Sequence, residues 1–138
     1  MTSVDEQLAS LDLFRGLSTA DLKKVRRLMT PTTIKAGEEF ITEGTPGQQA
    51  FLVLDGRASV RRGSKILSVV GPGDFLGEMS MLTGDRRTAT VTAETDMDVE
   101  VLNRREFASL LEEQPKLAIK LLMAVINRLR QLEPGLVG

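Results

Sequence analysis

The sequence of 138 residues contains no cysteine, histidine, tryptophan or tyrosine, and these absences exclude several classes of protein. Without cysteine there can be no disulfide framework, no thiolate nucleophile and no iron–sulfur cluster held by thiolates. Without histidine there is no imidazole for a haem, a zinc site or a serine–histidine dyad. Without tryptophan and tyrosine, aromatic platforms on which nucleic acid bases stack are not expected.

Charge and hydrophobicity are those of an ordinary globular domain. Lysine and arginine number 18 and aspartate and glutamate 19, a balance unlike the strong basicity of a chain that coats DNA. The longest apolar run, from Leu121 to Ile126, is far shorter than the about 20 residues of a membrane span. The first residues are polar and acidic and do not resemble a signal peptide. We therefore expect a cytoplasmic protein.

Residues 1–31 predict helices. Apolar residues recur at helical spacing before Gly16. Ser18 and Asp21 predict the start of a second helix, and Pro31 is expected to end it. The second helix carries a basic cluster that we interpret as a solvated face and not as a nucleic-acid patch. This cluster consists of Lys23, Lys24, Arg26 and Arg27.

Residues 32–102 predict a β-roll. Short β-branched and apolar runs alternate with turns such as Asp55-Gly56 and Gly63-Ser64. The pattern favours a closed antiparallel roll, a jelly-roll-like barrel. The predicted strands are Thr32–Ile34, Glu38–Ile41, Phe51–Leu54, Ala58–Arg61, Lys65–Val70, Ala89–Thr92 and Val99–Leu102.

Residues 103–138 predict two further helices. Asn103 and Glu106 are typical of a helix N-terminus, and Pro115 suits the first turn of a longer helix that reaches Leu132. The segment Leu117–Leu132 is apolar on more than one face, so we expect it to cover a ligand and to contact a second copy, with packing on the roll as the alternative. The fold class is thus α+β, a single domain over 1–138 in which helices flank an antiparallel β-roll.

One stretch inside the roll, Phe75 to Val91, does not have the pattern of a strand. Gly77 permits a tight turn or a close approach to a ligand, and the residues after it can form about one helical turn whose amides bind an anion. Arg87 offers a planar fork of donors that suits a phosphate. Glu78 beside an anion site indicates that the ligand also presents a hydroxyl, such as a ribose 2′-OH. Arg86 is expected to face solvent.

This stretch closely resembles the phosphate-binding cassette of cyclic-nucleotide-binding domains, the family of the catabolite activator protein, protein kinase A regulatory subunits and cyclic-nucleotide-gated channels. The upstream motif from Gly37 to Gly56 and the phrase Gly71-x-Gly73-Asp74 are similar to that family too. The resemblance spans almost the whole chain. The matching cassette residues are Phe75, Gly77, Glu78, Met79, Met81, Leu82, Arg87, Thr88, Ala89, Thr90 and Val91.

The resemblance implies a role for each residue of the cassette. Arg87 would pair with the phosphate, and the cradle would be completed by the amides of Gly77 and Met79, the Thr88 side chain, the Ala89 backbone and Ser80. Glu78 would accept the ribose 2′-OH. Leu76 and either Val69 or Val70 are candidates for contact with the base or sugar. Met79, Met81 and Leu82 are otherwise expected to be mostly core.

The resemblance implies a regulatory sensor and not an enzyme. The ligand would be cAMP, which we favour, or cGMP, because the Thr88 hydroxyl can also contact guanine. No prosthetic group and no metal are expected. Two alternatives remain: an interaction module with a degenerate pocket, and a cupin-like enzyme, which would normally need histidine ligands.

The partner expectations follow from the same resemblance. The transcription-factor branch of the family carries a helix-turn-helix after its long helix, and this sequence has six residues after Leu132. We therefore expect no nucleic acid to bind this chain alone, and an effector domain or protein outside it.

Overall fold

The computed structural model describes residues 4–11 and 14–132, and these form two compact units. The first, here called the roll unit, comprises residues 28–106 and contains the strands β1 to β8. The second, here called the helical unit, combines the described residues before 28 with those after 106. No helix within the described ranges has the length and hydrophobicity to span a membrane.

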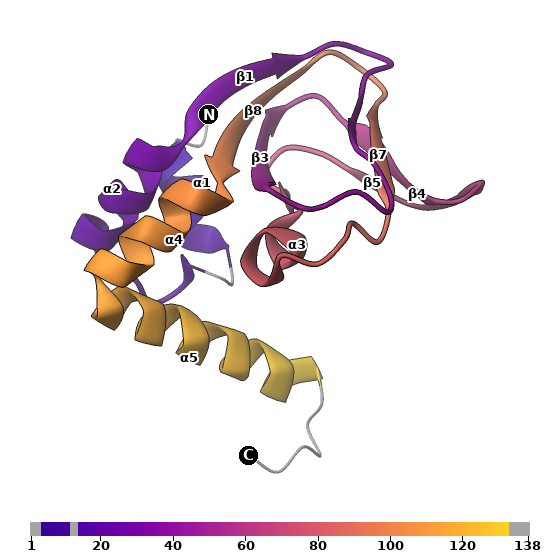
Figure 1. Ribbon diagram of the computed structural model, residues 1–138. Helices are drawn as coiled ribbons and strands as arrows, with labels where there is room; N and C mark the ends of the chain where they lie inside the picture. The colour runs from indigo at the N-terminus through magenta and orange to yellow at the C-terminus, as the bar shows by residue number, and fades with distance from the viewer. Residues whose placement is uncertain (1–3, 12–13, 133–138) are drawn as a thin grey trace. The chain divides into compact units, whose positions relative to one another are not determined.

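The roll unit consists of two antiparallel sheets of four strands each, in the orders β1-β8-β3-β6 and β2-β7-β4-β5 (Figure 1). Among the described strands, β1 pairs only with β8 and β2 only with β7, so hydrogen bonds do not join the sheets into a barrel. The predicted α+β class with an antiparallel roll is confirmed, but the roll is open and not closed as the strand pattern suggested. The strands are β1 (Thr30–Ile34), β2 (Glu39–Ile41), β3 (Gln49–Asp55), β4 (Ala58–Arg62), β5 (Lys65–Val70), β6 (Phe75–Leu76), β7 (Thr90–Ala93) and β8 (Met97–Asn103).

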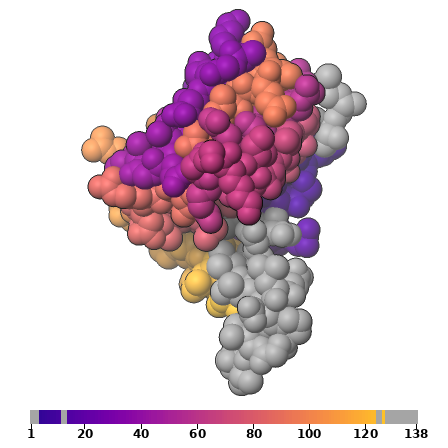
Figure 2. All heavy atoms as spheres, turned by 90° about the vertical axis from the view of Figure 1, so that its right-hand side faces the viewer, coloured from indigo at the N-terminus to yellow at the C-terminus, as the bar shows by residue number. Residues whose placement is uncertain are grey.

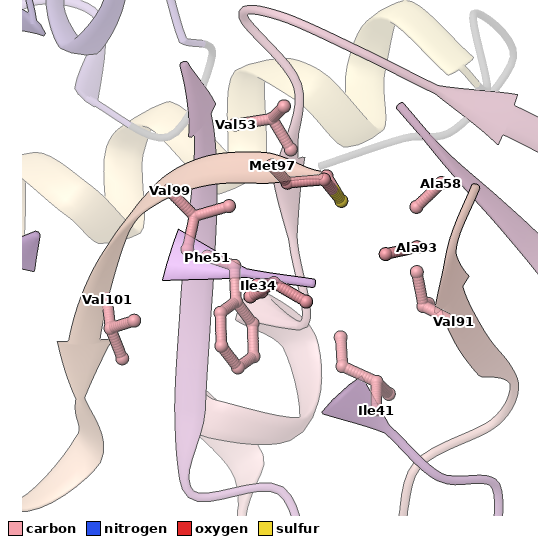
Figure 3. Packing of buried hydrophobic residues seen from close by; sticks show 10 residues of the cluster. All are labelled: Ile34, Ile41, Phe51, Val53, Ala58, Val91, Ala93, Met97, Val99 and Val101. Atoms are coloured by element: carbon pink, nitrogen blue, oxygen red, sulfur yellow. The ribbon is translucent and has the colours of Figure 1, made fainter. Parts of the chain in front are cut away.

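The core of the roll unit lies between the two sheets. On β8, Met97, Val99 and Val101 point inward at the alternating spacing that a strand imposes. Figure 3 shows these side chains on one side of the cluster, with Val91 and Ala93 of the other sheet on its opposite side. Phe51 of β3 also packs edge-to-face on Phe40, with ring centroids 5.3 Å apart. The burial of both inner faces fixes the strand register, because a slip of one residue would turn the apolar side chains outward.

The short helix α3 (Glu78–Thr83) interrupts the sheet directly after β6. Glycine with a positive φ stands on each side of it, Gly77 at 77° and Gly84 at 78°. The Gly84 N–H donates to the Ser80 carbonyl at 2.7 Å, which ends the helix. The helix lies beside β3 at one end of the roll unit (Figure 1).

The β4–β5 hairpin forms much of the surface drawn in magenta in Figure 2. Two hydrogen bonds hold its turn against neighbouring segments. The Arg62 Nε donates to the Thr88 carbonyl at 3.1 Å, and the Gly63 N–H donates to a Glu43 carboxylate oxygen at 3.0 Å. The hairpin is therefore anchored beside the segment that carries Arg87 and Thr88.

The helical unit is built from α1 (Val4–Ser10), α2 (Thr19–Leu28), α4 (Arg104–Glu113) and α5 (Pro115–Leu132), with α2 and α4 running across the unit boundary. The Ser18 hydroxyl caps α2 by accepting the Asp21 N–H at 3.1 Å, as the sequence predicts. Asp21 also accepts a hydrogen bond from the Lys120 ammonium at 2.8 Å. This bond to Lys120 is the main reason that the pKa of Asp21 is lowered.

The end of α2 differs from the prediction. The helix stops at Leu28, and Pro31 lies in β1 opposite Glu100 instead of ending a helix. Proline is tolerated there because β1 is an edge strand, where a missing N–H costs no bond in the sheet. The side chains of Val125, Leu129 and Leu132, which the sequence assigns to a ligand-covering or dimer helix, lie outside the described part of the chain.

Candidate functional site

A cavity of ≈ 190 Å³ lies in the roll unit where α3 faces β2, β4 and the segment before β7. All seven predicted site residues line it: Gly77, Glu78, Met79, Ser80, Arg87, Thr88 and Ala89. Apolar side chains from Ile41, Val60, Leu76 and Val91 complete its wall. Val69 and Val70 were candidates for contact with the base or sugar. They line a different cavity, next to Asp55 and Gly71.

Arg87 is the most constrained of the site residues. Its side chain is only 8% exposed. Its Nη1 donates to the Gly77 carbonyl at 2.9 Å and its Nη2 to the Gln49 carbonyl at 2.6 Å. A guanidinium has five N–H donors, so three remain without a partner among the described residues. The charge is thus held at the wall of the cavity with donors to spare for an anion.

The backbone of Arg87 is held by the loop between β2 and β3. The Arg87 N–H donates to the Thr45 carbonyl at 2.8 Å, and the Gly44 N–H donates to the Arg87 carbonyl at 2.9 Å. Arg86, in contrast, is exposed and donates to the Gly44 carbonyl at 2.7 Å. The structure therefore turns Arg87 inward and Arg86 outward, as the sequence predicts.

Glu78 lines the same cavity as Arg87, and its negative charge acts on the Arg87 guanidinium. Burial lowers the pKa of the Arg87 guanidinium, and the charge of Glu78 opposes that shift. Arginine remains charged at any ordinary pH despite the lowering. The Glu78 carboxylate accepts no hydrogen bond and forms no ion pair within the described residues, although it lines the same cavity. It is available to accept a donor from a ligand.

Two glycines make room for the Arg87 guanidinium. Gly77 has a φ of +77°, and a Cβ there would collide with Nη1 of Arg87. Gly47 is buried, and a Cβ there would collide with the side chain of Ser80 and approach Cζ of Arg87 to 3.2 Å. Both positions therefore require glycine: Gly77 lines the cavity, and Gly47 packs behind Ser80 and Arg87, which line it.

Four residues of the predicted cassette differ from one another in exposure. Thr88 is exposed, and its hydroxyl has no partner within the described ranges. Met81 is buried, as expected for core, but Met79 is 71% exposed and Leu82 is also exposed, so the assignment of these two to the core was wrong. A six-residue helix can turn only one face to the protein, and Met81 occupies that face.

Two contributors to the site were not predicted. Gln49 acts through its backbone carbonyl, which no side-chain pattern reveals. Gly47 was noted only as part of a glycine-containing motif. Its position two residues before β3 is the only sequence signal of its role.

Residues 31–114, more than half of the chain, match the family model of the cyclic nucleotide-binding domain. The chain belongs to this family. The N-terminal domain of a transcriptional regulator from Streptomyces coelicolor A3(2) has a similar structure, with a TM-score of 0.86 and 31% identity over 96% of this chain and 98% of that one. The regulatory domain of Toxoplasma gondii PKA, solved with cAMP, has a TM-score of 0.72 and 31% identity over 77% of this chain and 42% of its own.

A curated relative extends the comparison to a complete protein. The CRP-like cAMP-activated global transcriptional regulator of Mycobacterium tuberculosis is 25% identical over 138 residues. The alignment covers 96% of this chain and 62% of the regulator. The chain thus spans less than two thirds of that relative's length.

Proposed function

We propose that this cyclic nucleotide-binding domain binds cAMP in preference to cGMP and acts as a regulatory sensor, not as an enzyme. One observation carries the proposal: a buried arginine with uncommitted donors and an unpaired carboxylate line the same cavity. A ligand that carries only negative charge would be repelled by the Glu78 carboxylate in this cavity. A ligand with a phosphate and a neighbouring hydroxyl uses both groups. Relatives described as cAMP-activated or solved with cAMP support this ligand class.

The phosphate end of the ligand binds at Arg87. The guanidinium fork pairs with the charged phosphate oxygens. The Met79 N–H lies in the first turn of α3, where a helix supplies no backbone acceptor, and can donate to the same group. The Thr88 hydroxyl and the Ala89 backbone border the cavity on the strand side. Together these donors replace the water that a phosphate loses on binding.

The ribose binds at Glu78, whose carboxylate accepts the 2′-OH. We predict that Glu78→Gln weakens cAMP binding roughly 10- to 100-fold, because a hydrogen bond to a charged group contributes about 1.5–3 kcal/mol. Binding of 2′-deoxy-cAMP, which lacks the donor, should change much less. Isothermal titration calorimetry with both nucleotides measures this difference.

Glu38→Gln is the matched control, because Glu38 lines a separate cavity with Thr30 and Asn103 and its substitution should leave both affinities unchanged. Equal losses for cAMP and 2′-deoxy-cAMP in Glu78→Gln would contradict the ribose assignment.

The size of the cavity bears on where the base lies. At ≈ 190 Å³ it is smaller than the about 300–1,000 Å³ typical of small-molecule sites. The phosphate and ribose therefore occupy it, and the base extends toward its apolar rim near Val60 and Leu76. The Thr88 hydroxyl, which lines the cavity, can also contact a guanine base, so cGMP is the competing ligand. Competition of unlabelled cGMP against bound cAMP measures the preference, and we expect cAMP to bind more tightly.

The C-terminal helices are proposed to respond to the ligand and to join two copies of the chain. On α5, Ile119, Leu122 and Met123 are exposed apolar residues at the spacing of one helical face. A face of this kind is the usual surface by which helices associate. We propose that a second copy covers it through the segment Leu117–Leu132.

The dimer is tested by placing a charge on this face. Leu122→Glu should convert a dimer to a monomer, because it buries an unpaired carboxylate in the interface. Light scattering after size-exclusion chromatography measures the mass. Ile66→Glu is the matched control, since Ile66 on β5 is as exposed as Leu122, 63% against 59%, but lies in the roll unit. A monomeric parent would contradict the dimer.

A further inference from the structure

Arg104, the first residue of α4, is hydrogen-bonded both to α3 and to the residue that precedes β3. Its Nε donates to the Met81 carbonyl at 2.9 Å. Its backbone N–H donates to the Gln48 carbonyl at 2.8 Å. Its guanidinium also lies against Gly84, where a Cβ would come within 3.2 Å of Nη2. One residue thus joins the beginning of α4 to the end of α3.

The helix α3 is consequently held by an arginine at each end. Arg87 bonds the carbonyl of Gly77, immediately before the helix, and Arg104 bonds the carbonyl of Met81 in its last turn. A cation near the last carbonyls of a helix interacts favourably with their partial negative charge. With only six residues and a fixed bond at each end, α3 should move as one piece.

Both arginines are also bonded to adjacent carbonyls where β3 begins. The backbone N–H of Arg104 donates to Gln48, the residue before β3, and the side chain of Arg87 donates to Gln49, its first residue. The Gln49 side chain in turn donates to Asn103, the residue before Arg104, at 3.0 Å. Arg87, the proposed phosphate-binding residue, and the first turn of α4 are therefore both bonded to Gln48 or Gln49.

We infer that Arg104 is a positioning residue that transmits nucleotide occupancy to α4. The inference rests on the proposed function, because it needs a phosphate at Arg87. A phosphate bound by the remaining Arg87 donors moves the guanidinium, which bonds the Gly77 carbonyl next to α3, and α3 shifts with it. The shift changes the bond between Arg104 and the Met81 carbonyl, so the first turn of α4 follows. Coupling of this kind requires that the ligand favours one of two arrangements.

The absence of native cysteine allows a direct test by site-specific spin labelling. A parent protein with Ser64→Cys in the β4–β5 turn and Lys116→Cys on α5 carries one label in each unit, and both positions are exposed. Double electron–electron resonance measures the distance distribution between the labels without and with saturating cAMP. Calorimetry measures the cAMP affinity of the same samples. We expect cAMP to change the distribution in the parent.

Arg104→Met removes the side-chain donor to Met81, keeps most of the aliphatic stem and leaves the backbone bond to Gln48 in place. It should keep the cAMP dissociation constant within about threefold and lose the cAMP-induced change in distance, since coupling and affinity are separate quantities. Arg104→Lys retains one donor group and should restore part of the change. Arg105→Met, at the exposed neighbouring position, should behave like the parent. A variant that was merely damaged in folding would lose affinity as well.

A full cAMP-induced change in Arg104→Met would overturn the inference, as would a parent that binds cAMP without any change. If Arg104→Met does not fold, an unaltered response in Arg104→Lys overturns it and a reduced response with parental affinity supports it. A parent that shows no heat of binding would instead remove the proposed function, and this inference with it.

Discussion

Arg87→Met is expected to weaken cAMP binding by about 30-fold to about 4,000-fold, which corresponds to roughly 2–5 kcal/mol. The reason is that the ligand phosphate would then be desolvated in the cavity without its charged partner. The same substitution leaves the carbonyls of Gly77 and Gln49 without their donor, so the protein should also be less stable. Calorimetric titration gives the affinity and urea unfolding gives the free energy of unfolding.

The loss of affinity must be separated from the loss of stability. Arg87→Lys keeps the charge but cannot form a planar fork, so it should recover only part of the affinity. Arg86→Met is the neighbouring control: it removes an exposed arginine that bonds only the Gly44 carbonyl among the described residues, and it should leave cAMP affinity nearly unchanged. Parental affinity in a folded Arg87→Met variant would show that Arg87 does not bind the phosphate.

Gly77→Ala is expected to impair both stability and binding. A residue with a side chain at a φ of +77° costs about 1–2 kcal/mol relative to glycine. In addition, the new methyl group collides with Nη1 of Arg87 and lies 3.1 Å from the Gln49 carbonyl oxygen. The guanidinium must move, and with it the proposed phosphate site. We therefore expect a lower free energy of unfolding and at least about tenfold weaker cAMP binding.

Gly37→Ala separates the two effects. Gly37 has a φ of +88°, so it carries a similar backbone cost, but a Cβ there meets nothing within 4 Å. Gly37→Ala should lower stability by about 1–2 kcal/mol and leave cAMP affinity unchanged. If Gly77→Ala and Gly37→Ala had the same effect on affinity, the close packing of Gly77 against Arg87 would have no role in binding.

The gathering of the candidate site residues at one cavity could be predicted from the sequence to a large extent, because these residues are close together along the chain. Gly77, Glu78 and Arg87 lie within eleven positions, and α3 followed by a turn brings them to one cavity. The inward direction of Arg87 and the outward direction of Arg86 also agree with the prediction. Gln49 could not be found in the same way, because it contributes a backbone carbonyl from a distant strand.

The errors in the fold prediction have local physical causes. The strand β6 was missed because it has only two residues, too few for an alternating pattern. Pro31 was interpreted as a helix end, whereas an edge strand also accepts proline. Closure of the roll was inferred from the number of strands, but whether β1 and β2 pair is decided by contacts between segments far apart in the sequence. The role proposed for Arg104 likewise depends on a long-range bond, to Met81.

The central claim is that the cavity beside Arg87 and Glu78 binds a cyclic nucleotide. The most direct test is a calorimetric titration of the parent chain with cAMP, with 5′-AMP as the non-cyclic counterpart. The proposal predicts saturable binding of one cAMP per chain with micromolar or tighter affinity; a dissociation constant of about 1 μM corresponds to about 8 kcal/mol. Binding of 5′-AMP should be much weaker, because its phosphate is not joined to the 3′ oxygen and is not held in a fixed position relative to the ribose 2′-OH. Absence of heat with cAMP and with cGMP, in a protein shown to be folded, would contradict the claim and favour an interaction module with an empty pocket.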